Sequence, residues 1–324
     1  MPITSIEKNP EDLTMTVVAD FAVPRQRLWD AYTDPRQIEK FWGPPTWPAT
    51  FTRHDVAVGG RSEYYMTGPD GERAGGIWEF TGVDPSNSFA VRDGFAAEDG
   101  TLNAEMPTMD VTFTFEDTAE GSRLVTVTSF NSIEDLEQLL GMGMEEGLTA
   151  AMGQVDAVLA DLSSFAVGRD TESQILSDTQ VRVSRIIRGS VQDVWRAHND
   201  ESLLRQWLLG PDGWTMPVCE VATEVGQSYR YEWEQEGGEG RFGFTGELTE
   251  STPPTRSVTT EMMIGMPGPG TTNELTLTPT TGGTLLTLVI TYPNVELRDT
   301  VLGTGMVDGM ETSYARLEAD VLSA

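Results

Sequence analysis

A chain of 324 residues is long enough for two domains of ordinary size, each able to bury a core without disulfides or metal ions. Its 51 acidic and 21 basic side chains give a formal net charge of −30, which repels phosphate backbones and anionic lipid headgroups and so excludes nucleic acid and membrane surfaces as expected partners. The single cysteine, Cys219, excludes an internal disulfide, and without an apolar leader or a run of about 18 apolar residues the chain is expected to be cytoplasmic, with no membrane insertion.

An internal repeat organises the sequence. The matching segments, in chain order, are 28–31 with 194–197, 43–44 with 210–211, 58–59 with 225–226 and 141–144 with 303–306. Because the matches keep their order and their offsets drift only between 162 and 167, they predict two tandem copies. We place the copies at residues 1–163 and 179–324, joined by a polar linker at 164–178.

The first copy begins with a strand at residues 13–23, where apolar residues alternate with polar ones. Two short helices follow, at 25–33 and 35–42, separated where Pro35 disfavours the helical conformation of Asp34. Six further strands are predicted at 50–58, 62–67, 77–83, 88–93, 109–115 and 123–130.

Each copy is predicted to close with one long amphipathic helix. Apolar residues recur at steps of three or four from Leu148 to Leu162, and again from Met306 to Val321. An antiparallel sheet followed by a helix long enough to cross it indicates an α+β fold. We therefore predict two tandem helix-grip domains, each a curved seven-stranded antiparallel sheet wrapped around a long C-terminal helix, with two short helices after the first strand and a pocket between sheet and helix.

These elements carry the motifs of a known family. In the first copy the motifs are the segments 28–35 (LWDAYTDP), 41–44 (FWGP), 58–61 (VGGR) and 68–71 (GPDG), and the second copy repeats them more loosely. The chain resembles proteins similar to the C-terminal domain of the activator of heat-shock protein 90 ATPase, within the SRPBCC, or START-like (Bet v 1-like), superfamily. The resemblance implies the helix-grip fold, and its members include hydrophobe carriers, polyketide cyclases, ring-hydroxylase subunits and chaperone activators.

The candidate pocket residues are large apolar side chains on the inner face of the sheet and on the closing helix. They are Tyr64, Met66, Trp78, Phe80, Met144, Met152, Tyr229, Tyr231, Trp233, Phe242, Phe244, Met306, Met310 and Tyr314. Methionine and aromatic side chains can adapt to an apolar ligand, but the same stripes also suit a filled core. Both interpretations of these residues are kept.

The sequence offers little for catalysis. His54 on one predicted strand and Tyr64 on the next could form a proton-transfer pair, whereas His198 suits a surface or capping role. The sequence has no GxSxG or SxxK motif and no phosphate-binding glycine loop, and Cys219 has no histidine near it in sequence. We therefore expect no cofactor and no metal.

Three hypotheses about function remain open. The first is non-covalent binding of an apolar or amphipathic small molecule. The second is a cyclase-like or hydrolase-like enzyme that uses a pocket histidine or tyrosine, and the third is an interaction module that associates with a chaperone. A homodimer is also possible through an exposed edge strand. The sequence leaves open the ligand and the copy that binds it.

Overall fold

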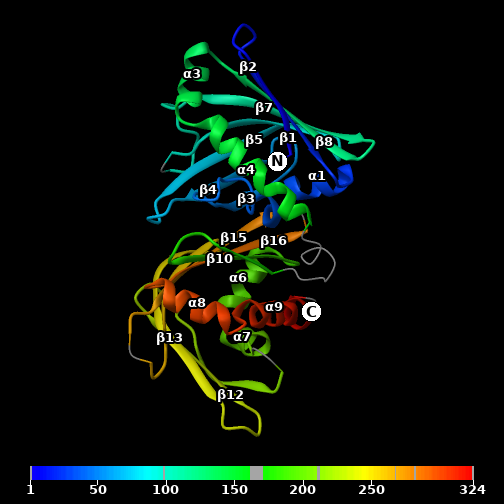
Figure 1. Ribbon diagram of the computed structural model, residues 1–324. Helices are drawn as coiled ribbons and strands as arrows, with labels where there is room; N and C mark the ends of the chain where they lie inside the picture. The colour runs from blue at the N-terminus through cyan, green and yellow to red at the C-terminus, as the bar shows by residue number, and fades with distance from the viewer. Residues whose placement is uncertain are drawn as a thin grey trace. The chain divides into compact units, whose positions relative to one another are not determined.

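The computed structural model describes residues 2–97, 99–160, 171–209, 212–266, 268–280 and 282–322. It divides into two compact units, residues 1–166 and 167–324, called here the first and the second half. Each half contains an eight-stranded antiparallel sheet with helices against one of its faces (Figure 1). The predicted α+β fold in two tandem copies is confirmed.

The first half contains β1 (Ile3–Asn9), β2 (Thr14–Phe21), α1 (Arg25–Thr33), α2 (Pro35–Ile38), β3 (Ala49–His54), β4 (Arg61–Thr67), β5 (Arg73–Asp84), β6 (Ser88–Phe95), β7 (Thr108–Thr118), β8 (Gly121–Phe130), α3 (Ile133–Gly141) and α4 (Met144–Ala160). Its strands are ordered β1-β2-β8-β7-β6-β5-β4-β3. Figure 1 shows α4 crossing one face of this sheet.

The second half contains β9 (Glu172–Ile175), β10 (Gln180–Ile187), α6 (Val191–Asn199), α7 (Glu201–Trp207), β11 (Trp214–Glu220), β12 (Ser228–Gln235), β13 (Arg241–Thr252), β14 (Arg256–Met263), β15 (Thr271–Thr280), β16 (Gly283–Thr291), α8 (Val295–Gly303), α9 (Met306–Arg316) and the π-helical turn η1 (Leu317–Leu322). Its order, β9-β10-β16-β15-β14-β13-β12-β11, repeats that of the first sheet strand for strand.

Each sheet has eight strands rather than the predicted seven. The additional strands are β1 and β9, which lie at the sheet edge and pair with β2 and β10. An edge strand has a partner on one side only and needs little apolar content, so its pattern resembles that of a polar loop. Strand β9 lies within the predicted linker, so residues 172–175 belong to the second sheet, and residues 164–170 of that linker lie outside the described residues.

The helices begin and end where local chemistry requires. The Asp34 side chain accepts a hydrogen bond from the Arg36 amide and caps α2, and the Ser190 side chain caps α6 in the same way through Asp193. The predicted closing helices correspond to α4 in the first half and to α9 with η1 in the second, and an additional helix, α3 or α8, precedes each. The break between the two helices falls at Gly143 in the first half and Gly305 in the second, with φ of 88° and 81°.

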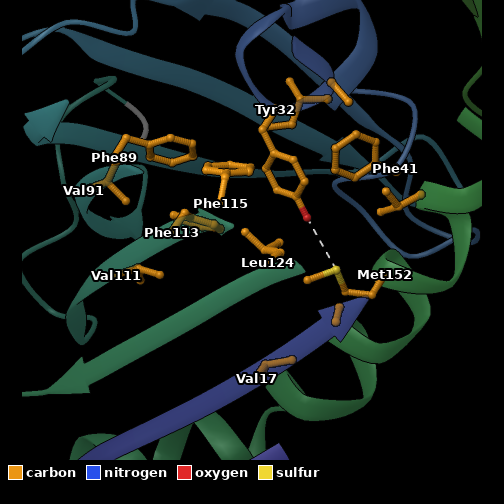
Figure 2. Close-up of a cluster of buried hydrophobic side chains, with 14 of the residues drawn as sticks. Val17, Tyr32, Phe41, Phe89, Val91, Val111, Phe113, Phe115, Leu124 and Met152 are labelled. Atoms are coloured by element: carbon orange, nitrogen blue, oxygen red, sulfur yellow. Dashed lines mark hydrogen bonds between the residues drawn. The ribbon is translucent and has the colours of Figure 1, made fainter. Parts of the chain in front are cut away.

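The two halves fill their interiors differently. In the first half one continuous cluster of buried side chains extends from β2 across the sheet to α4. Figure 2 shows part of it, with Phe89, Phe113 and Phe115 directed at the same interior as Tyr32 and Met152. In the described part of the second half, the buried side chains form three separate clusters.

Candidate ligand-binding site

In the first half, several residues predicted to line a pocket fill the core instead. Trp78 and Phe80 on β5 are 0% and 2% exposed, and Met152 on α4 accepts a hydrogen bond from the Tyr32 hydroxyl at 3.4 Å. The Trp42 and Trp78 rings meet edge to face, with centroids 4.6 Å apart. Close contacts of this kind leave these residues the role of core packing.

His54 has structural partners in the first half. Its Nε2 lies 3.0 Å from the Tyr32 carbonyl oxygen and must donate to it, so Nδ1 accepts the hydroxyl proton of Ser62 at 2.7 Å. Burial lowers the pKa of His54 to about 4, which keeps the imidazole neutral. Both ring nitrogens of His54 therefore bond to groups other than Tyr64. The proton-transfer pair of His54 with Tyr64 stays a prediction.

Tyr64 belongs instead to a polar centre inside the first half. It lies beside Trp42, Trp78 and the carboxyl of Asp93 on β6, and burial together with the Asp93 charge raises the pKa of Tyr64. The indole N–H groups of Trp42 and Trp78 are buried and are not aligned for a hydrogen bond. Both lie close enough to the Tyr64 hydroxyl to oppose the rise in its pKa. Burial also raises the pKa of Asp93, to about 7.

In the second half, the aromatic residues predicted to line a pocket fall into two groups. Trp233 is buried, stacks on Phe242 with centroids 5.0 Å apart and donates from Nε1 to the Leu208 carbonyl at 2.7 Å. Tyr314 is buried against Trp207. Six other apolar side chains, on β12, β13, β15, β16 and α9, pack against the same core but are only partly buried, and we call them the half-exposed cluster: Tyr231, Phe242, Phe244, Leu275, Leu288 and Met310.

The remaining predicted methionines lie where helix and sheet meet. Met66 and Met144 are partly buried against the large core of the first half. Met306 packs against the small cluster around Val181, where its sulfur accepts a hydrogen bond from the Tyr292 hydroxyl at 3.8 Å.

Glu261 on β14 is a site residue that the sequence did not reveal. The Tyr229 hydroxyl lies 3.1 Å from Glu261 Oε2 and 2.9 Å from the Thr260 carbonyl oxygen, and it donates towards both. Burial raises the pKa of Glu261, although Tyr229 and the side chain of Asn273 favour its ionised form. Glu261 as a residue is only partly buried, and its carboxyl lies among the polar groups of Tyr229, Thr260 and Asn273.

Asp93 and Glu261 occupy the same position in the two sheets. In the first sheet Ser62 pairs with Trp78, which pairs with Asp93. Ser62 corresponds in the repeat to Tyr229, which pairs with Gly246. The register on either side, Phe244 with Met263 and Leu248 with Thr259, places Glu261 opposite Gly246. A comparison of β6 with β14 in register could have found the pair, since both place an acidic residue on the inner face.

A buried ion-pair cluster fixes the closing helix of the second half. Arg185 on β10 is 1% exposed and pairs with Glu311 on α9 and, at 3.1 Å, with Glu318 on η1. Glu318 also accepts a hydrogen bond from the Arg188 amide at 2.8 Å. These donors lower the pKa of both carboxyls below the ordinary value despite their burial. The cluster ties β10 to α9 and η1.

The described ranges contain neither a metal-binding group of side chains nor a membrane-spanning helix. Across residues 2–322, apart from the gaps stated above, no three His, Cys, Asp or Glu side chains are grouped as a metal site. Over the same ranges, no helix has the length and apolarity that crossing a bilayer requires. His198 donates from Nδ1 to the Val194 carbonyl inside α6 at 2.8 Å, and its ring lies against Trp207 with its Nε2 buried, so it has neither the surface nor the capping role expected of it.

Comparison with known proteins supports the tandem arrangement. The family model described as Activator of Hsp90 ATPase homolog 1-like protein matches residues 22–160 and again residues 188–321. Protein Ms6760 from Mycobacterium smegmatis is 46% identical over 49% of this chain and 98% of its own, with a TM-score of 0.47. A protein from Arthrobacter aurescens is 42% identical over 49% of this chain and 92% of its own, also with a TM-score of 0.47. No curated protein matches the chain.

Proposed function

The chain belongs to the Activator of Hsp90 ATPase homolog 1-like protein family, and from this premise we propose that it binds an apolar or amphipathic small molecule without covalent chemistry. We place the ligand in the second half, between the sheet and α9. There it lies against the half-exposed cluster.

The divided core of the second half carries this proposal. A helix-grip domain that serves only as a scaffold is expected to fill its interior, as the first half does with one continuous cluster. In the second half the half-exposed cluster packs against the largest of three smaller cores, and Leu288, Met310 and Tyr231 also contact the other two. Apolar side chains that face a helix and yet stay partly exposed gain free energy when a ligand covers them.

The energy available matches a modest affinity. At about 25 cal/mol per Å² of apolar surface removed from water, a ligand that covers roughly 300 Å² gains about 7 kcal/mol. Part of this gain offsets the loss of the ligand's translational and rotational freedom. Binding on the order of micromolar to millimolar is therefore expected from apolar contact alone.

The test fills the proposed site in one half and the equivalent position in the other. Met310 in α9 corresponds in the repeat to Leu148 in α4, and both side chains are partly buried. We expect the uncharged probe diphenylhexatriene to bind the wild-type chain with a rise in fluorescence. Met310→Trp should weaken this binding at least about tenfold, because the larger side chain takes up the space of the probe.

Leu148→Trp is the matched control and should leave the affinity within about twofold. Circular dichroism of both variants checks that each remains folded. Equal losses of probe affinity in the two variants would contradict the proposal. No rise in probe fluorescence with the wild-type protein would also contradict it.

A further inference from the structure

We propose that Glu261 anchors an ammonium group, so that the ligand of the second half is an amphipathic organic amine whose apolar part lies against the half-exposed cluster. This inference rests on the proposed function and names the class of ligand that the site takes. It starts from the partners of the Glu261 carboxyl.

Glu261 has hydrogen-bond donors but no cationic partner. Within the ranges that the structure describes, its partners are the Tyr229 hydroxyl and the side chain of Asn273, and no arginine or lysine pairs with it. A carboxylate taken out of water is costly unless a positive charge accompanies it. In the same half, Glu311 and Glu318 show the paired alternative, since the two carboxylates share the Arg185 guanidinium.

The neighbours of Glu261 suit an organic cation. Tyr229 and Tyr231 lie side by side on β12 with ring centroids 5.0 Å apart. Burial raises the pKa of both phenols and of Tyr292, so all three are neutral at pH 7 and add no negative charge beside the carboxyl of Glu261. Aromatic faces attract ammonium groups, and the half-exposed cluster next to them covers an alkyl or aryl chain.

The charge of the whole protein favours the same sign of ligand. A formal net charge of −30 raises the local concentration of cations and repels anions such as fatty acids. Among amphipathic molecules, amines are therefore expected to bind in preference to carboxylates of equal chain length.

The first half shows the same carboxyl position in a filled form. Asp93 lies on the corresponding strand, also without a basic partner in the described part of the chain, and the Trp78 indole covers it. In the second half the residue corresponding to Trp78 is Gly246, which carries no side chain. In place of an indole, the Tyr229 ring and the Thr260 backbone lie beside Gly246, since a Cβ on this glycine would come within 2.9 Å of Tyr229 Cε1.

The experiment compares octylamine with octan-1-ol by isothermal titration calorimetry at pH 7.5 and low ionic strength. The two probes share an alkyl chain and differ in charge. The variants are Glu261→Gln and Glu247→Gln, which remove the same charge from β14 and from the exposed position 247 of β13. Glutamine at position 261 retains an acceptor for the Tyr229 hydroxyl.

We expect wild-type protein to bind octylamine at least about tenfold more tightly than octan-1-ol. Glu261→Gln should remove that preference and leave the octan-1-ol affinity within about twofold, whereas Glu247→Gln should change neither. If wild-type protein binds both probes equally, or if Glu261→Gln weakens both alike, the amine inference is wrong and the proposed function stands. If neither probe binds, both are wrong.

Discussion

Replacing Arg185 by methionine tests whether the buried ion-pair cluster holds α9 to the second sheet. Methionine has a similar length and no charge, so the substitution leaves Glu311 and Glu318 without their shared guanidinium. Removing one partner of a buried ion pair typically costs about 3–5 kcal/mol, because the remaining charge stays desolvated.

The lower end of that range applies here. Glu318 keeps the amide and the guanidinium of Arg188 as donors, and Glu311 keeps the amide and hydroxyl of Thr171. We therefore expect the free energy of unfolding of the second half to fall by about 3 kcal/mol. For a unit of this size, that corresponds to a decrease in Tm of roughly 6–12 °C.

Cys219 allows the second half to be measured by itself. It is the single cysteine of the chain and is buried in the second half, so urea-dependent pulse labelling of its thiol follows the unfolding of that half alone. The control is Arg241→Met, which removes an exposed partner of Glu232 while Arg230 remains, and should cost less than about 1 kcal/mol. A loss below about 1 kcal/mol in Arg185→Met would refute the reasoning.

Acid should diminish the difference between Arg185→Met and wild type. Both carboxyl pKa values are lower in the folded state than the ordinary 4.5. The stabilisation is therefore fully present above about pH 4.5 and is lost as the pH falls through the folded values.

Two further outcomes follow from buried titratable groups. Burial raises the pKa of Asp93 from 3.8 to about 7, so ionisation of Asp93 increasingly opposes folding as the pH rises through that range. In urea titrations, Asp93→Asn should therefore stabilise the first half by about 2 kcal/mol at pH 8 and by almost nothing at pH 4. Equal effects at the two pH values would contradict this expectation. Burial also raises the pKa of the Cys219 thiol, from 9.0 to about 11. At pH 8 the native protein should therefore react with a thiol reagent at least about 100-fold more slowly than the urea-unfolded chain. A comparable rate would show that the Cys219 thiol is accessible to solvent in the folded protein.

The sequence predicted the fold well where periodicity is strong. The alternation in residues 13–23 and the helical steps from Leu148 onward each match an element of the structure, β2 and α4. The edge strand β1 escaped prediction because it presents few buried apolar side chains, and the short helix α3 was not predicted at all. The omission of α3 has another origin, because Ser132 caps this helix and Leu136 and Leu139 lie on its buried face, both of which are signals that the sequence contains.

The site was harder to predict than the fold. A strand with alternating apolar residues has the same sequence pattern whether its side chains fill a core, as Trp78 does, or stay partly exposed, as Phe244 does. The difference depends on how the opposite helix and the neighbouring strands fill the interior, which one strand's sequence does not contain. Asp93 and Glu261 were hidden for another reason: a single acidic residue at the end of a strand usually faces solvent, and only strand register turns these two inward.

The divided core also determines how each half tolerates sequence change. In the filled interior of the first half, an added methylene group forces neighbouring side chains out of their rotamers and costs about 1–3 kcal/mol. In the second half, enlarging Leu275 or Leu288 meets partly exposed surroundings. Duplication thus gives this chain one copy whose interior is nearly fixed and one whose interior can be reshaped, so a new ligand preference can evolve by ordinary changes of side-chain size.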